Sequence, residues 1–263
     1  MKIIKVPLNA GGMSKRNGVE KGPDAIEKHL DDFYINESGL MPLFDIEEVS
    51  LDNSNVEEAH QAICDAVDKL GSNPQFTILV GGDHSMTYPA FKAFAKNNPG
   101  TGLVVLDAHP DCQEHQIPPT HEDYLRVLID EGILDPHKVA LIGARNMSKE
   151  ERKYLEEKKI KNYSMKEISF EGLKEVVDSV MSVAREWKKV YLSIDIDVLD
   201  SAFAPGTGYS EPGGLTTREL IYIVQRLKLI RNIAIADINE VNPDKDIQEM
   251  TSKAAAKVIV ELN

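Results

Sequence analysis

Acids and an imidazole follow a short apolar run in the segment GLVVLDAHPDCQ, residues 102–113. Asp107 comes directly after the run, and His109 and Asp111 follow at every second position. In an extended chain, residues two apart point to the same face, so these three side chains are expected to lie side by side. Crowded carboxylates repel one another and raise each other's pKa unless a cation keeps them ionised. The segment therefore predicts either a polar turn or one wall of a cation site.

Polar groups also follow three other apolar runs, FTILV, VYLSI and IAIA. These groups are Asp83 and His84, Asp195 and Asp197, and Asp237 and Glu240. Helix caps or solvated turns would explain any one pair, but they explain the whole set poorly. We therefore expect a metal site built from carboxylates and imidazoles, a ligand set that suits Mn²⁺, with Fe²⁺, Co²⁺ or Zn²⁺ possible. The candidate ligands exceed the needs of one tetrahedral ion and suffice for two ions that hold a hydroxide between them.

The order of the expected elements indicates an α/β fold. Strands are expected at 3–6, 43–49, 76–80, 103–106, 139–142, 160–163, 190–194 and 233–236. Helices are expected at 23–30, 56–70, 89–95, 122–131, 149–158, 170–187, 217–227 and 248–262, with Thr216 as the cap of the helix at 217. This alternation predicts a mainly parallel sheet of about eight strands with helices on both faces, in one domain over 1–263. Ligands bind such sheets outside the carboxyl ends of the strands, where the polar groups lie.

Composition limits the classes of partner. With 263 residues, 42% of them hydrophobic, and a formal charge of −13, the chain can bury a core but has no surplus of cations for nucleic acid or acidic membranes. It contains two cysteines and has neither an apolar run of about 18 residues nor a signal-peptide pattern, so a cytoplasmic protein is expected. A nucleophilic role for Cys112 is disfavoured, because the flanking acids would raise the pKa of its thiol.

Together, the segments GGDHS, DAHPD, SIDIDVLDSAFAPGTG, GGLTTREL and DINEVNP resemble the signatures of the arginase/agmatinase (ureohydrolase) family, in the family's order. NGVEKGPDAI near the amino terminus matches a further segment, so the likeness covers nearly the whole chain. The resemblance implies an arginase-like fold and a binuclear manganese site. It assigns the first ion to His84, Asp107, Asp111 and Asp195. It assigns the second ion to His109, Asp107, Asp195 and Asp197, so that Asp107 and Asp195 bridge.

The resemblance also implies a reaction. Hydroxide attacks a guanidinium carbon, and C–N cleavage releases urea and an amine. Asp111 would orient the hydroxide, and Glu240 would pair with the planar guanidinium cation. A histidine in the loop after DAHPD would handle the proton of the leaving amine, and His121 is preferred to His115 because it precedes an expected helix.

The substrate's far end is where the sequence departs from arginases. The segment IGARNMSKEE has Asn146 and Ser148 where arginases carry acids, and Tyr209 and Ser210 replace the family's Thr-Pro. Asn146, Ser148 and Tyr209 are the expected substrate contacts besides Glu240. An acidic mouth formed by Glu114, Glu122 and Glu211 would suit agmatine, which is the favoured substrate.

L-Arginine is the second choice of substrate, followed by other guanidino acids and formimidoyl-glutamate, for whose carboxylates only Arg145 offers a cation. A metal-binding homologue without turnover is the alternative of a different class, although the complete set of expected ligands argues against it. The resemblance further implies a homotrimer or homohexamer that acts on a small cationic guanidino molecule.

Overall fold

Eight parallel strands form one sheet at the centre of the protein, in a computed structural model that describes residues 1–12, 17–72 and 74–263. The strand order is β2-β1-β3-β8-β7-β4-β5-β6, and every neighbouring pair is parallel. The strands are β1 (Lys2–Val6), β2 (Asp45–Glu48), β3 (Thr77–Gly81), β4 (Thr101–Leu106), β5 (Val139–Ile142), β6 (Lys161–Tyr163), β7 (Lys189–Asp195) and β8 (Ile233–Asn239).

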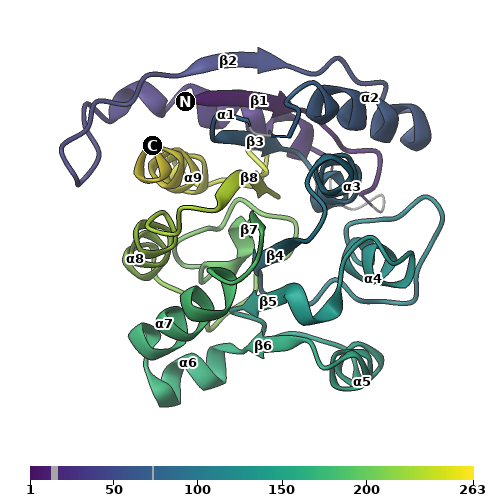
Figure 1. Cartoon of the computed structure of the whole chain (residues 1–263). Coiled ribbons are helices and arrows are strands. Elements are labelled where there is room, and N and C mark those ends of the chain that lie inside the picture. Colours follow the sequence, from purple (N-terminus) through teal and green to yellow (C-terminus); the bar gives the residue numbers. More distant parts are fainter. Residues whose placement is uncertain (13–16, 73) are drawn as a thin grey trace.

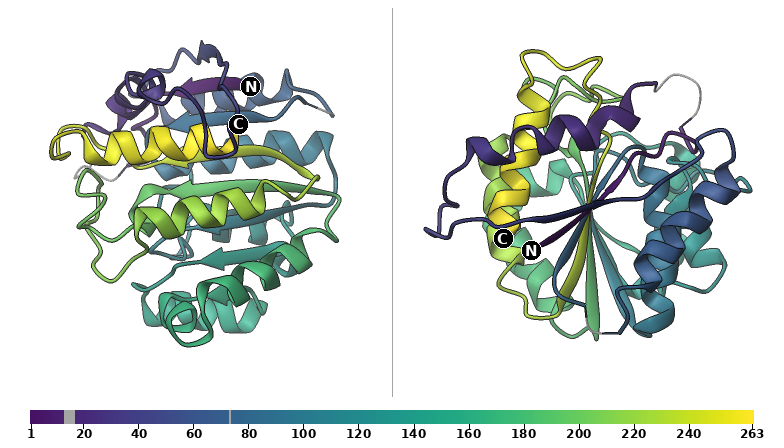
Figure 2. Two further views of the ribbon diagram at one scale, coloured as in Figure 1. Left: turned by 90° about the vertical axis from the view of Figure 1, so that its left-hand side faces the viewer. Right: turned by 90° about the horizontal axis from the view of Figure 1, so that it is seen from above.

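Helices cover both faces of this sheet (Figures 1 and 2). One face carries α1 (Gly22–Glu27), α6 (Met165–Glu171), α7 (Leu173–Ala184), α8 (Thr217–Leu227) and α9 (Met250–Leu262). The other face carries α2 (Val56–Asp68), α3 (Thr87–Asn97), α4 (Tyr124–Asp130) and α5 (Lys149–Lys158). The protein is therefore a three-layer α/β/α structure.

Each central strand contributes to two hydrophobic cores, one on each side of the sheet. In β4, Val104 and Leu106 belong to the core beneath α7, α8 and α9, whereas Leu103 and Val105 belong to the core beneath α2, α3 and α4. Side chains alternate between the two faces of a strand, so a strand covered on both faces must be apolar throughout. This requirement explains the uninterrupted apolar run before Asp107.

The sheet order brings the polar strand ends together. The four strands with acids or imidazoles at their carboxyl ends, β3, β8, β7 and β4, are consecutive neighbours in the sheet. All four run in the same direction, so their carboxyl ends lie along one edge of the molecule. Segments more than 150 residues apart in the sequence thus meet at one place.

The structure confirms the predicted parallel α/β fold, and Thr216 caps α8 by accepting a hydrogen bond from the backbone N–H of Glu219. The single helix expected at 170–187 is wrong. Gly172 has a φ of +95°, so it ends α6 and separates it from α7. Among the described residues, no helix has the length and apolar character needed to cross a bilayer.

Gly82, which precedes the first site residues, packs against the backbone so closely that a side chain cannot fit. A Cβ at Gly82 would lie 1.8 Å from the carbonyl oxygen of Leu8. We expect Gly82→Ala to lower the free energy of unfolding by about 3 kcal/mol, measured by urea denaturation. Gly132 is the matched control, because it has a φ of +72° but no heavy atom within 4 Å of the added Cβ. Gly132→Ala should cost about 1 kcal/mol through its backbone alone, and equal losses in the two variants would contradict the steric account.

Candidate metal centre

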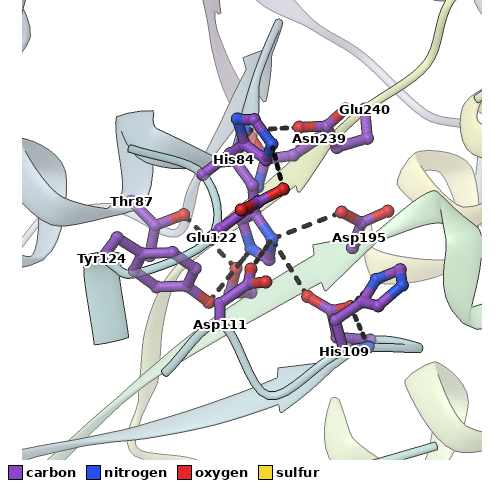
Figure 3. A network of polar contacts seen from close by, with 12 residues as sticks. His84, Thr87, His109, Asp111, Glu122, Tyr124, Asp195, Asn239 and Glu240 are labelled. Atoms are coloured by element: carbon purple, nitrogen blue, oxygen red, sulfur yellow. Dashed lines mark hydrogen bonds and ion pairs between the residues drawn. The ribbon is translucent and has the colours of Figure 1, made fainter. Parts of the chain in front are cut away.

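His84 lies among three carboxylates at the carboxyl edge of the sheet. Its Nδ1 atom is 3.1 Å from Asp107 Oδ2, 3.1 Å from Asp111 Oδ2 and 3.3 Å from Asp195 Oδ2. Figure 3 shows His84, Asp111 and Asp195 converging, with Glu240 at the top of the view. His84, Asp107 and Asp111 are buried and offer ligand atoms within 4.8 Å of one another, so a single small ion could contact these three groups together.

A second group of the same kind adjoins the first. The Nδ1 atom of His109 is 3.0 Å from Asp197 Oδ2 and 3.6 Å from Asp107 Oδ1. Asp107 therefore faces His84 with one carboxylate oxygen and His109 with the other. A carboxylate placed in this way can contact one ion on each side, and the bridging role of Asp107 stays a prediction.

Strand periodicity predicts that these residues lie together, but the structure brings them together in a different way. The chain after Leu106 is not extended. Asp111 has a left-handed φ of +50°, and the N–H groups of Arg145 and Asn146 both donate to the carbonyl of Ala108. Asp195 ends β7, and the short 3₁₀ turn Ile196–Val198 then returns Asp197 to the cluster. The turns that follow the strands, rather than the alternation of side chains along a strand, therefore direct these side chains toward the cluster.

The carboxylates disturb one another's ionisation strongly. Burial and the charge of Asp107 raise the pKa of Asp111 to about 7, and burial and Asp197 raise the pKa of Asp195 well above its usual range. Burial opposes protonation of His109, but Asp107 and Asp197 raise its pKa far above the ordinary value. Two like charges 4 Å apart repel by about 4 kcal/mol at an effective dielectric constant of about 20. Without a cation, the cluster must therefore hold protons between its carboxylates and imidazoles.

The donor set fits one or two divalent cations. His84 Nδ1 and Asp107 Oδ2 are both inaccessible to solvent, and neither has a hydrogen-bond partner in the part of the chain that the structure describes. Buried polar atoms are nearly always hydrogen-bonded, so exceptions that face one another require an explanation. An ion between them would satisfy both atoms and remove the repulsion between the carboxylates.

Two acids near this edge do not join the cluster. The carboxylate of Asp83 accepts hydrogen bonds from Ser85 and from the backbone N–H of Gly11, so it caps the turn that carries His84. Asp237 lies within β8 rather than beyond it, and its side chain is fully buried beside Ser193. Both acids therefore support the cluster from outside.

Glu240 comes directly after β8 and is nearly inaccessible to solvent. Its Oε1 atom accepts a hydrogen bond of 2.9 Å from the backbone N–H of His84, which ties it to the neighbouring strand end. Glu240 has a φ of +67°, a conformation that costs free energy in a residue with a side chain and that collects at functional sites. The carboxylate is thus held in a fixed direction beside the first group of ligands.

The two loop histidines differ sharply in position. His121 is buried, and its Nδ1 atom lies 3.0 Å from the carbonyl oxygen of Gly11, which can only accept. Nδ1 therefore carries the proton, and the basic Nε2 atom lies 3.6 Å from Glu122 Oε1. His115 is exposed, and its Nδ1 atom lies 4.0 Å from Asp130. The geometry favours His121 over His115 as the residue that could exchange a proton with a ligand.

A cavity of about 340 Å³ opens beside the two groups of ligands. Its lining residues are His109, Asp111, Gln113, Glu122, Asn146, Met147, Ser148, Glu151, Tyr209 and Glu211. The three residues expected to contact the substrate besides Glu240 are among them. Each of the three already forms a hydrogen bond within the protein. Ser148 caps α5 through the N–H of Glu151, Asn146 donates to Glu211 at 2.7 Å, and the Tyr209 hydroxyl donates to Glu122 at 3.1 Å.

Arg145, the one cation considered for a substrate carboxylate, is committed to the protein backbone. Its guanidinium donates to five carbonyl oxygens at distances between 2.7 and 3.3 Å, those of Asp197, Val198, Leu199, Glu211 and Pro212. Cys112 is buried, its thiol donates to the carbonyl of Pro110, and burial and Glu151 raise its pKa well above the usual value. Both side chains are therefore structural.

Sequence reasoning missed two residues that contact His84, Ser193 and Tyr124. It named Asp237 but missed its supporting role. Ser193 lies 2.8 Å and the Tyr124 hydroxyl 3.2 Å from His84 Nε2. Strand alternation could have indicated Ser193, because it precedes Asp195 by two residues and shares its face. Nothing in the sequence pattern distinguishes Tyr124 from the apolar residues that follow it in α4.

Comparison with known proteins finds similar chains over nearly the whole length of this one. The chain matches the Arginase family over residues 1–263. It is 33% identical over 270 residues to a formimidoylglutamase of Halalkalibacterium halodurans, a match that covers 98% of this chain and 84% of that protein. It is 35% identical over 222 residues to an agmatinase of Bacillus anthracis, covering 83% and 73% of the two chains. The crystal structure of a formimidoylglutamase from Bacillus subtilis superposes with a TM-score of 0.93 at 28% identity, covering 99% of this chain and 85% of that one.

Divalent ions should stabilise the folded protein, because the cluster exists only in that state. At a free Mn²⁺ concentration about 100 times the dissociation constant, one bound ion adds about 2.7 kcal/mol, which calorimetry detects as a higher Tm. Asp195→Asn should abolish most of this gain, since Asp195 is buried against His84. Asp178→Asn is the control, an acid paired with Lys174 and Arg226 on the surface. An equal rise in Tm for both variants would contradict the metal site.

Proposed function

The chain belongs to the arginase family of hydrolases that act on C–N bonds, and from this premise we propose that it hydrolyses a guanidino compound with a cationic tail, agmatine in first place. The products are urea and an amine. The choice of a substrate with a cationic tail rests on the charge of the cavity. The described residues that line the cavity include four acids and no lysine or arginine.

Two divalent ions, Mn²⁺ in first place and Co²⁺, Fe²⁺ or Zn²⁺ as alternatives, are the proposed cofactors. His84, Asp107, Asp111 and Asp195 would hold the first ion, and His109, Asp107, Asp195 and Asp197 the second. Carboxylate and imidazole ligands without thiolates suit these metals. Such a pair of ions supplies a hydroxide nucleophile near neutral pH.

Glu240 is the proposed partner of the substrate guanidinium. A carboxylate and a planar guanidinium form two parallel hydrogen bonds, which fixes the orientation of the cation as well as its position. The N–H of His84 holds Oε1 of Glu240, so the carboxylate is oriented before any substrate enters. Preorganisation of this kind lowers the cost of ordering the substrate next to the nucleophile.

His121 is the proposed proton carrier for the departing amine. The carbonyl of Gly11 fixes the proton on Nδ1, which leaves Nε2 able to take up a proton and deliver it. Glu122, 3.6 Å from Nε2, would stabilise the imidazolium form. Asp111 lines the same cavity as Glu122, where its carboxylate would accept a hydrogen bond from the nucleophile.

The structure bears on the competing substrates through charge. Formimidoyl-glutamate carries two carboxylates and L-arginine carries one, and each would enter a cavity lined by Glu122, Glu151 and Glu211. Arg145 could not compensate, because its guanidinium is bonded to five carbonyls. Relatives in this family include formimidoylglutamases, arginases and agmatinases, so family membership alone does not select the substrate.

The proposal predicts urea release from agmatine with Mn²⁺, and less from L-arginine, guanidinobutyrate and guanidinopropionate. Formimidoyl-glutamate, which the same C–N cleavage would convert to glutamate and formamide, should yield neither product. Glu240→Gln should lower kcat/KM for agmatine roughly 100-fold, because it leaves the guanidinium beside a neutral amide. Release of glutamate and formamide from formimidoyl-glutamate as the main activity would refute the choice of substrate. Metal binding without turnover of any of these compounds would favour a non-catalytic homologue.

The two loop histidines give a matched pair of variants. His121→Asn should lower kcat about 100-fold or more with little change in metal content, since it removes the proton carrier. His115→Asn should leave kcat unchanged, because His115 is exposed and lies next to Asp130. A loss of kcat in His115→Asn with normal kcat in His121→Asn would reverse the assignment.

A further inference from the structure

The two histidines of the proposed metal centre each use their second ring nitrogen in a different contact. Both direct Nδ1 toward carboxylates of the cluster. The Nε2 atom of His84 lies 2.8 Å from the Ser193 hydroxyl, and the Nε2 atom of His109 lies 3.3 Å from Glu211 Oε1. The choice of which nitrogen carries the proton decides whether Nδ1 can bind an ion.

Asp237 determines the direction of the Ser193 hydroxyl. Its buried carboxylate accepts a hydrogen bond of 2.6 Å from Ser193, and also accepts from Tyr191, Thr87 and Asn239. Ser193 is the donor of that hydrogen bond, so its hydroxyl hydrogen points to Asp237. The Ser193 oxygen then presents a lone pair to Nε2 of His84, and a hydrogen on Nε2 satisfies this contact, with the Tyr124 hydroxyl, 3.2 Å from the same nitrogen, as a second acceptor. A proton on Nδ1 is then the one that an ion replaces.

Glu211 orients the imidazole of His109 in the same way, but no residue lies between the two side chains. Its carboxylate faces Nε2 directly, and Asn146 holds the same oxygen atom at 2.7 Å. Glu211 is about 20% exposed and lines the cavity, whereas Asp237 is fully buried within β8, opposite Ser193 of β7. The two supports therefore differ in exposure, although they present the same chemistry to the two imidazoles.

We propose that Asp237, acting through Ser193, and Glu211 are positioning residues that hold Nδ1 of His84 and of His109 ready for the two ions. The inference rests on the metal centre of the proposed function. It extends that function by assigning one supporting carboxylate to each ion. Partners of this kind that orient metal-binding histidines typically change metal affinity by about 10- to 100-fold when they are removed.

The test uses the full-length metal-free protein titrated with Mn²⁺ alone by calorimetry, with cadmium NMR of the same variants to distinguish the two ions. Ser193→Ala should weaken the ion beside His84 by about 10- to 100-fold and leave the ion beside His109 unchanged. Glu211→Ala should do the reverse. Tyr191→Phe removes a different hydrogen bond to Asp237 and should leave both affinities as they are.

Each outcome decides between defined alternatives. Wild-type affinity for both ions in Ser193→Ala and Glu211→Ala would overturn the inference. A parallel loss of both ions, with a lower Tm of the metal-free protein, would also overturn it in favour of a purely structural role. Glu211 is partly exposed, so its variant remains informative even if Ser193→Ala does not fold. Failure of the wild-type protein to bind Mn²⁺ would refute the proposed metal centre itself.

Discussion

The burial of four aspartates in one cluster is the constraint on which the rest of this structure depends. Asp107, Asp111, Asp195 and Asp197 are each at most 7% exposed, and two of them have strongly raised pKa values. Isolated carboxylates in such a place cost several kcal/mol each, and their mutual repulsion adds to that cost. The cluster is tolerable only if cations or shared protons offset this repulsion, and the position and direction of its side chains follow from that requirement.

The fold meets this requirement through the order of its strands. Because β3, β8, β7 and β4 are neighbours, the ends of β3, β4 and β7 bring one, three and two of the proposed ligands to the same edge, and the end of β8 brings Glu240. The two cores on the faces of the sheet hold these strands rigidly, while the turns beyond them adopt the strained conformations of Asp111 and Glu240. Precision therefore comes from the sheet, and the direction of each side chain comes from the turn that follows its strand. Outside the ligands, Asp83 accepts a hydrogen bond from the N–H of Ser85 and Asp237 accepts one from the Ser193 hydroxyl, so both acids support the neighbours of His84.

The sheet, the helices on both faces and the family could be predicted from the sequence. Buried parallel strands give uninterrupted apolar runs, and the family's motifs are short contiguous segments. The resemblance to the arginase family and the parallel α/β fold are both confirmed. The interruption at Gly172 was missed, since the amphipathic pattern continues past it and its φ cannot be read from periodicity. The bonds that occupy Arg145, Asn146 and Tyr209 were not foreseeable either, because they join loops far apart in the chain. Local patterns thus indicate which residues meet, and only the turns show which atoms remain available to a ligand.

The measurement that tests the central claim most directly is anomalous diffraction from crystals of this protein soaked in Mn²⁺. The account predicts two peaks per chain on either side of the Asp107 carboxylate, one next to Nδ1 of His84 and the other next to Nδ1 of His109. A single peak, or peaks that approach Nε2 of either histidine, would contradict the binuclear arrangement. The absence of any peak at a saturating concentration of Mn²⁺ would show that protons, and not ions, hold the carboxylates together.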